Sequence, residues 1–185
     1  MGGIDIYSLI IICISALWVM LPAYLPNPVA AALGGGRPVD GGRCWRDGRR
    51  IFGDGKTLRG FLAGVAGGVV IGLIQIFIQS RIGLWVFPEH TLMSITLLAV
   101  GALLGDLAKS FLKRRKGVGR GEKWPVADQF DLVIGAFIML LIFDPGWLLS
   151  AITLPIAIAI LILTPILHRG TNIIGYILGI KDVPW

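Results

Sequence analysis

Long apolar runs separated by short polar segments dominate this 185-residue chain. The first run, residues 6–25, carries no charge, and at about 1.5 Å per helical residue it can cross a hydrocarbon core about 30 Å thick. Pro26 and Pro28 are expected to end this helix, leaving a cationic, glycine-rich loop over 29–57. The whole pattern predicts about five transmembrane helices in a single domain, 1–185, at residues 6–25, 58–79, 91–113, 131–143 and 148–167.

Small residues recur at helical spacing inside two of these runs. In the second run, glycines stand four apart at positions 60, 64, 68 and 72, and Gly101 and Gly105 repeat the spacing in the third. Residues four apart share one helix face, and small residues there let helix backbones approach closely in lipid. The pattern predicts tightly packed helices and no catalytic role for these glycines.

Composition supports the same class of protein. The chain is 55% hydrophobic and 15% charged, with a mean hydropathy of +0.80, whereas about a quarter of residues are charged in ordinary soluble domains. We expect an all-α integral membrane protein without a second, soluble domain. The tail after residue 169 is too short and polar to span, and its isoleucines at 173, 174, 177 and 180 predict a C-terminal interfacial helix.

Positive charge is concentrated in a few places. The net charge is +6, and of the 17 lysines and arginines all but Arg81 lie within 37–59, 109–123 and 169–181. Five crossings place all three stretches on one side, which the positive-inside rule makes cytoplasmic. The prediction is a multi-pass cell-membrane protein with an external N-terminus and with its C-terminus and active-site loops in the cytoplasm. Nucleic acid is not expected as a partner, and the oligomeric state is left open.

The third apolar run ends in a polar face. Asp106, Lys109, Ser110 and Lys113 stand at i, i+3, i+4 and i+7, so they share about two turns of one helix face. A polar cluster between helices would account for one such residue. Four of them indicate an aqueous binding surface, because charge at the edge of a membrane is costly unless it serves a site.

Two further carboxylates, Asp128 and Asp131, stand at i and i+3 where the next helix is expected to begin. With Asp106 they would supply oxygen ligands from two helices. Hard oxygen ligands without Cys or His suit Mg²⁺, which completes its shell with water and substrate phosphates. Helix capping is the alternative for Asp128, since Asp favours helix N-termini.

Basic, glycine-containing segments lie beside these carboxylates. Lys113, Arg114 and Arg120 belong to the run between the two helices, where cations and backbone amides would bind phosphates, although contact with anionic lipid headgroups is an alternative. The earlier loop contains GDGKTLRG over 53–60, which opens into a helix and adds Lys56, Thr57 and Arg59 as further phosphate ligands. This motif lacks the spacing of a P-loop, which excludes a Walker-type NTPase.

The segment from Ser110 to Asp131, SFLKRRKGVGRGEKWPVADQFD, resembles the signature of the integral-membrane CTP:phosphatidate cytidylyltransferase superfamily. The chain's length, the DGRRIFGDGKTLRG segment, GDLAKSFLKRR and the ending NIIGYILGIKDVPW resemble its archaeal branch, the CDP-archaeol synthases. Gln129 stands where the bacterial pattern has Arg, and the His-Gly-Gly of that pattern is absent. The resemblance implies Mg-dependent transfer of a cytidylyl group from CTP to an unsaturated ether-lipid phosphate drawn from the bilayer.

The resemblance also implies roles for particular residues. It implies catalytic roles for Asp106, Lys113, Asp128 and Asp131, the three aspartates as Mg²⁺ ligands, and nucleotide or phosphate binding by Lys56, Thr57, Arg59, Ser110, Lys113 and Arg114. From the residues themselves, Arg120 is a further candidate for phosphate binding and Asn27 for framing the nucleotide. Two alternatives are an ester-lipid phosphatidate cytidylyltransferase and a membrane ion or lipid transporter. A transporter would place its charges near the bilayer midplane, whereas these charges crowd one rim. A lipid-binding scaffold would leave the three carboxylates unexplained.

Overall fold

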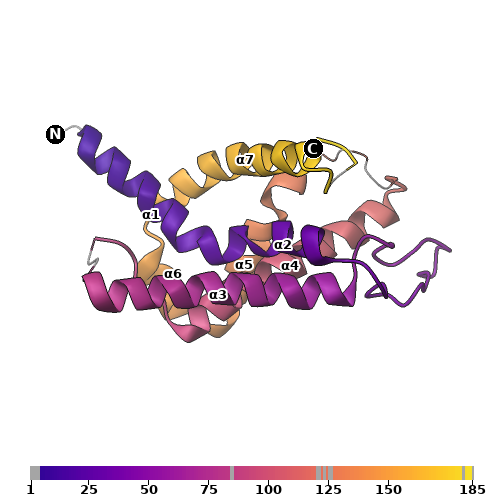
Figure 1. Cartoon of the computed structure of the whole chain (residues 1–185), viewed down its shortest axis with the longest axis horizontal. Helices are drawn as coiled ribbons and strands as arrows, with labels where there is room; N and C mark the ends of the chain where they lie inside the picture. Colours follow the sequence, from indigo (N-terminus) through magenta and orange to yellow (C-terminus); the bar gives the residue numbers. More distant parts are fainter. Residues whose placement is uncertain are drawn as a thin grey trace.

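The computed structural model describes residues 5–83, 86–119, 122, 124, 127–180 and 182–184. The residues described are helical apart from their connections, with two isolated antiparallel bridges and no strand. Figure 1 shows the long helices side by side in an elongated bundle. The helices are α1 (Ile6–Tyr24), α2 (Pro26–Leu33), α3 (Leu58–Ile82), α4 (Leu92–Arg115), α5 (Ala127–Phe143), α6 (Pro145–Ala151) and α7 (Leu154–Ile177).

The prediction of an all-α membrane protein is confirmed. Among the described residues, 4 helical stretches are long and apolar enough to cross a membrane: Ile6–Leu33, Leu58–Ile82, Leu92–Arg115 and Leu154–Ile177. Large apolar side chains such as Leu62, Phe77 and Leu154 point outward from them and are exposed. An exposed apolar surface of this extent is stable only against lipid or another apolar partner. The chain is therefore a multi-pass membrane protein.

The first helix, α1, ends at Tyr24, close to the predicted end at residue 25, but a second helix follows directly, so the prediction that a loop begins at residue 29 is wrong. Leu25 keeps a right-handed helical conformation, and α2 follows from Pro26 to Leu33. Proline is tolerated in the first turn of a helix, where the amide it lacks would have no helical partner. The loop begins at Gly34, and α2 lies against the first turns of α3 (Figure 1).

The predicted glycine stripe of α3 forms its buried face, with Gly60, Gly64, Gly68 and Gly72 all buried. A Cβ added at Gly64 would lie 2.6 Å from the Pro26 carbonyl oxygen, and one at Gly68 would lie 2.5 Å from the Pro22 carbonyl oxygen. Such close approaches leave no room for a side chain. The stripe therefore seats α3 directly on the backbone of α1 and α2.

Glycines also join α4 to α5. A Cβ at Gly101 would lie 2.6 Å from the Ala136 Cα, and one at Gly135 would lie 2.2 Å from the Gly101 carbonyl oxygen. Around this contact, apolar side chains of α1, α4, α5 and α7 form the core, including Met20, Leu98 and Leu140. The α4–α5 pair is thus a rigid unit near the centre of the bundle.

The C-terminal part differs from the sequence prediction. A short helix, α6, replaces the expected beginning of the fifth helix at residue 148, and α7 continues ten residues past the predicted end at 167, to Ile177. The separate interfacial helix predicted for the tail is not confirmed. Within the added turns, Asn172 is buried and Thr171 donates to the His168 carbonyl 3.0 Å away. Within the polar segment at 168–172, Asn172 is the side chain that faces the protein interior.

Candidate active site

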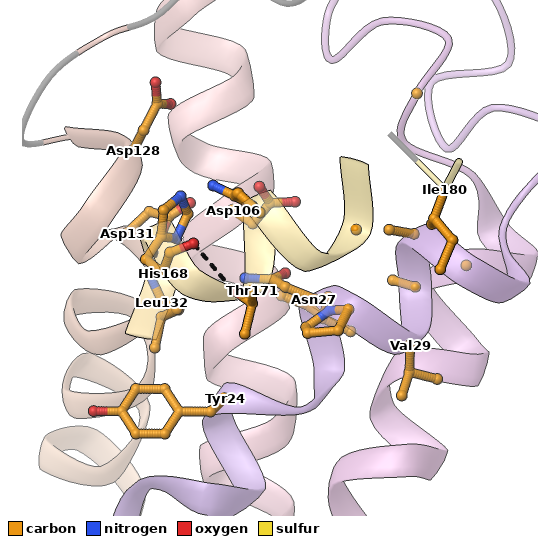
Figure 2. Close-up of a pocket in the computed structure, with 18 of the residues that line it drawn as sticks. Tyr24, Asn27, Val29, Asp106, Asp128, Asp131, Leu132, His168, Thr171 and Ile180 are labelled. Atoms are coloured by element: carbon orange, nitrogen blue, oxygen red, sulfur yellow. Dashed lines mark hydrogen bonds between the residues drawn. The ribbon is translucent and has the colours of Figure 1, made fainter. Parts of the chain in front are cut away.

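A pocket of about 1080 Å³ opens between α2, α4, α5, α7 and the loop that precedes α3. Figure 2 shows Asp106 and Asp131 near one end of this pocket and Tyr24 near the other. Charged side chains from α4, α5 and the loop form its polar end: Lys56, Asp106, Lys109, Lys113, Asp128 and Asp131. The remaining wall is largely apolar. The pocket thus joins a charged region to a hydrophobic one.

The three aspartates converge on a single lysine, Lys109. Its Nζ lies 2.7 Å from an oxygen of Asp131 and 3.1 Å from one of Asp106. An oxygen of Asp128 is 3.5 Å from the same Nζ. The predicted gathering of these carboxylates from two helices is therefore observed. Among the described residues, no group of three or more His, Cys, Asp or Glu side chains is arranged to hold a metal ion. The ammonium of Lys109 lies near all three carboxylates.

Two more lysines neutralise the outer carboxylates. Lys56, from the loop, forms an ion pair with Asp106. Lys113, one turn beyond Lys109 on α4, lies 3.1 Å from Asp128 and donates to the Glu122 carbonyl at 2.7 Å. Three carboxylates and three ammonium groups therefore meet at the polar end of the pocket. The cluster is balanced in charge as it stands, which offsets the cost of burying each group.

Close helix packing sets the positions of these carboxylates. A Cβ added at Gly105 would lie 2.0 Å from the Asp131 carbonyl oxygen, so the two helices touch at the level of the cluster. Asp106 follows Gly105, and the i, i+3 spacing places Lys109 on the same face. In α5, which begins at Ala127, Asp128 lies in the first helical turn and its side chain accepts a hydrogen bond from the Trp124 amide at 2.7 Å. This is not the N-cap contact considered for it, and Asp128 also lines the pocket.

The loop before α3 is built around a buried aspartate. Asp40 accepts hydrogen bonds from the Phe52 and Gly53 amides, each at 3.0 Å, and from Arg50 at 2.6 Å. Burial by itself would raise the pKa of Asp40, but these bonds and one from the Gly42 amide outweigh it and hold the pKa well below its usual range. The loop that carries Lys56 is therefore folded around a permanent negative charge.

The same loop is fastened to the C-terminal end of α4 by two arginines. Arg115 donates to Asp47 at 2.9 Å and to the Arg50 carbonyl at 2.5 Å. In return, Arg49 donates to the Arg114 and Arg115 carbonyls, at 3.3 and 3.0 Å. Free carbonyls at a helix end attract such donors. The arginines fix the distance between the loop and the helix that bear Lys56 and Asp106.

The predicted site residues divide into two groups. Asn27, Lys56, Thr57, Asp106, Lys113, Asp128 and Asp131 line the pocket, whereas Arg59, Ser110 and Arg114 are not among the described residues that line it. Thr57 also has a structural task, since its hydroxyl accepts from the Gly60 and Gly35 amides at 3.1 and 3.2 Å. Arg120 lies outside the described residues. The binding roles assigned to all these residues stay predictions.

Sequence reasoning placed Lys109 on the right face but gave it no role of its own. The spacing of Lys109 from Asp106 and from Lys113 was enough to place it on this helix face. Its contacts with α5 could be recognised only in the folded structure. The wall formed by α7, which includes Thr164, His168 and Asn172, was missed entirely. No sequence signal identified it, because α7 was expected to end before most of these residues.

The comparisons with known proteins agree with this arrangement. Residues 6–185 match the family described as "CarS-like: CDP-archaeol synthase". A CDP-archaeol synthase of Methanoculleus marisnigri is 61% identical over 166 residues, covering 90% of this chain and 100% of the relative. One of Methanosarcina barkeri is 49% identical over 175 residues, again covering 90% of this chain and 100% of the relative.

A solved structure supports the same relationship. It is described as an intramembrane enzyme for archaeal membrane lipids biosynthesis, and it is 34% identical to this chain with a TM-score of 0.69. The match covers 91% of this chain and 95% of that one. The family match extends over nearly the whole sequence, and relatives are identical to it at more than half of the aligned positions. This chain therefore belongs to the CarS-like family of CDP-archaeol synthases.

Proposed function

We propose that this chain transfers a cytidylyl group from CTP to 2,3-di-O-geranylgeranylglyceryl phosphate, an unsaturated archaeal ether-lipid phosphate, and releases CDP-archaeol and pyrophosphate. The observation that carries the proposal is the convergence of Asp106, Asp128 and Asp131 with three lysines at one end of a pocket whose remaining wall is largely apolar. Relatives named CDP-archaeol synthase, identical at up to 61% of aligned positions, support the same reaction.

The reaction suits these residues. An oxygen of the lipid phosphate attacks the α-phosphorus of CTP, the bond from that phosphorus to the bridging oxygen breaks, and pyrophosphate leaves. A phosphate monoester has a second pKa of about 6, so the nucleophile is already anionic near neutral pH and needs no general base. The remaining task is to bring two anions together, and Lys56, Lys109 and Lys113 supply cationic groups there. Positioning and charge neutralisation therefore carry the catalysis.

We also propose that the aspartates hold Mg²⁺. The donor set fits, because three carboxylates from two helices approach one point, the Lys109 ammonium, to within 3.5 Å, and Mg²⁺ prefers oxygen ligands. When bound there, Mg²⁺ would neutralise phosphate charge and orient the leaving group. Asn27, Thr57 and the glycine-containing loop would frame the nucleotide beside it, with Arg59, Ser110, Arg114 and Arg120 as further phosphate-binding groups.

The apolar part of the pocket suits the lipid. Its wall joins side chains of four helices, including Val29, Leu103, Leu132, Leu167, Ile173 and Ile174. A hydrocarbon chain of the lipid would be shielded from water there, while the phosphate of the same lipid reached the lysines. Substrate would enter laterally from the bilayer, between α2 and α7.

For the topology, we propose that α5 is the fifth crossing. It has 17 residues, about 26 Å at 1.5 Å per residue, which is at the short end of the range for membrane helices. Five crossings place the N-terminus outside and the pocket, the basic loops and the C-terminus in the cytoplasm, in agreement with the positive-inside rule. CTP would then reach the pocket from the cytoplasm.

The test is formation of CDP-lipid by the purified full chain in detergent with CTP and Mg²⁺. Ether-linked lipid phosphate and ester-linked phosphatidate are supplied in separate reactions, and product and pyrophosphate are both measured. We expect product with the ether lipid and a loss of at least about a hundredfold in Asp128→Asn. Asp5→Asn, at the exposed N-cap of α1, is the matched control. If neither lipid gave product, the result would contradict the proposal. Turnover by Asp128→Asn at the wild-type rate would show that Asp128 is not part of the site.

A further inference from the structure

Lys109 differs from the other lysines of the pocket in the number of carboxylates it contacts. Its Nζ lies within 3.5 Å of oxygens from Asp106, Asp128 and Asp131. Among the described ion pairs, Lys56 reaches only Asp106 and Lys113 reaches only Asp128. Lys109 is therefore the one cation shared by the whole acidic cluster in the described part of the chain.

The shared contact identifies a cation position. Three anionic side chains that face one point repel each other unless a positive charge occupies that point, and here the Lys109 ammonium does so. A divalent cation bound by the same carboxylates would need the same space and would repel the ammonium. Lysine and metal are therefore competitors for one set of oxygen ligands.

We propose that Lys109 is an internal counter-ion that a divalent cation displaces. Before metal enters, its ammonium holds the carboxylates of α4 and α5 together. When metal enters, the ammonium moves into the adjoining pocket and pairs with phosphate. The proposal rests on the proposed function for the identity of the metal and the nucleotide, and it adds a role for Lys109, which contacts the three proposed metal ligands.

The side chain is suited to such a movement. Lysine carries a point charge on a flexible four-carbon stem, and Lys109 itself lines the pocket, with its side chain 15% exposed. The adjacent space of about 1080 Å³ is where the nucleotide is expected. The ammonium can therefore exchange carboxylate for phosphate by rotation of its own bonds, without movement of α4.

The exchange couples metal binding to nucleotide binding. Metal alone has to separate Lys109 from three carboxylates and leaves the ammonium without an anionic partner. Metal with a nucleoside triphosphate brings more negative charge than the metal neutralises, so the displaced ammonium gains a new partner. Each ligand should consequently raise the affinity for the other, as binding linkage requires, and the site should take free metal weakly.

The experiment measures Mn²⁺ binding, by electron paramagnetic resonance, to the full chain in detergent. Wild type is compared with Lys109→Met, which keeps the stem and removes the charge, with Lys109→Arg, and with Lys116→Met as the matched loss of one charge outside the cluster. We expect Lys109→Met to bind free Mn²⁺ about tenfold more tightly than wild type, which is about 1.4 kcal/mol. CTP should tighten Mn²⁺ binding less in this variant than in wild type. Lys109→Arg and Lys116→Met should remain close to wild type.

A labelling measurement on the wild type covers the case in which Lys109→Met does not fold. Acetic anhydride modifies accessible amines, and mass spectrometry reports each lysine separately. Mn²⁺ should increase acetylation of Lys109 relative to Lys116, which lies over the Trp124 ring, 4.4 Å from its centroid, outside the cluster. Unchanged labelling would overturn the proposal.

The remaining outcomes are distinct. Equal Mn²⁺ affinity in wild type and Lys109→Met, or an equal gain in Lys116→Met, would overturn the exchange, since the second result would reflect bulk charge alone. Failure of every protein to bind Mn²⁺ would also overturn it, while CDP-lipid formation by the same preparation would leave the proposed function standing. Tighter Mn²⁺ binding by Lys109→Met without any CDP-lipid product from wild type would overturn only the proposed function.

Discussion

Gly105 of α4 packs directly on the backbone carbonyl of Asp131 in α5, where an added Cβ would lie 2.0 Å from the carbonyl oxygen. The neighbouring residue in the chain, Asp106, is paired through Lys109 with the Asp131 carboxylate. The geometry of the acidic cluster is thus set by contact between two backbones. A glycine that touches no ligand therefore determines where two of the proposed metal ligands lie.

Replacement of Gly105 by alanine should separate α4 from α5. Overpacking of this kind costs about 1–3 kcal/mol, and a shift at the level of Asp131 should lower CDP-lipid formation more strongly than it lowers the melting temperature. Gly170→Ala is the control, because a Cβ there meets nothing within 4 Å and alanine favours the helix by up to about 1 kcal/mol. Wild-type activity and stability in Gly105→Ala would show that the helices are not in contact there.

Asp40→Asn should disorganise the loop that presents Lys56. The Asp40 side chain is fully buried, and removing its charge leaves Arg50 and three backbone amides with a weaker acceptor, at a cost of about 3 kcal/mol. We expect a higher KM for CTP together with a lower melting temperature. Asp54→Asn is the control, since that side chain is 67% exposed and pairs with Arg50 alone among the described ion pairs. An unchanged KM for CTP in Asp40→Asn would contradict this role.

The low pKa of Asp40 gives the loop a defined response to acid. A carboxyl group whose pKa is lowered by folding contributes stability at pH values above its unfolded pKa of about 3.9 and loses it as the pH falls further. Wild-type loop structure, followed by hydrogen exchange of residues 37–57, should therefore be constant through the neutral range and weaken only below about pH 4. A transition near neutral pH would need another titrating group.

Arg115→Gln should release the same loop from α4. The substitution removes bonds to Asp47 and to the Arg49 and Arg50 carbonyls but leaves the apolar core untouched. Amides of residues 37–57 should exchange faster, while those of α4 before the last turn keep their protection. Lys116→Gln removes an equal charge from the neighbouring position and should leave exchange in the loop unaltered. Equal rates of amide hydrogen exchange in Arg115→Gln and wild type would show that Arg115 does not hold the loop against α4.

His90, at the opposite end of the bundle from the pocket, should make the protein sensitive to mild acid. Burial lowers the pKa of His90 to about 4, against a smaller opposing effect of the Trp18 carbonyl, and its ring stacks on Trp147 at 5.7 Å. The unfolded chain binds a proton near pH 6.5, so stability is lost as the pH falls from there toward 4. Between pH 7 and 5 the expected loss is about 2 kcal/mol.

Melting temperatures measured at these two pH values test the prediction for His90. His90→Asn should reduce the difference between them, because it removes the titrating ring. His168→Asn leaves His90 in place and should retain the difference. If the pH response persisted in His90→Asn, a group other than His90 would be responsible for it.

Much of this protein followed from patterns within single segments. The apolar runs predicted an all-α membrane protein, the glycines at 60, 64, 68 and 72 predicted the packing face of α3, and the spacing at Asp106 and Asp128 predicted which side chains share a face. The resemblance to the archaeal cytidylyltransferases is confirmed by the family match. These inferences succeeded because helical period and membrane thickness act on each segment independently of its neighbours.

Other features depended on contacts between distant segments. α2 forms on the glycine face of α3, α7 continues to Ile177 where its polar residues meet the pocket, and Lys109 acquires its role only when α5 brings Asp128 and Asp131 beside it. The sequence by itself determined the class of fold and the candidate chemistry. Tertiary structure decided where the helices end and which cation occupies the acidic cluster, because both follow from partners that no local pattern identifies.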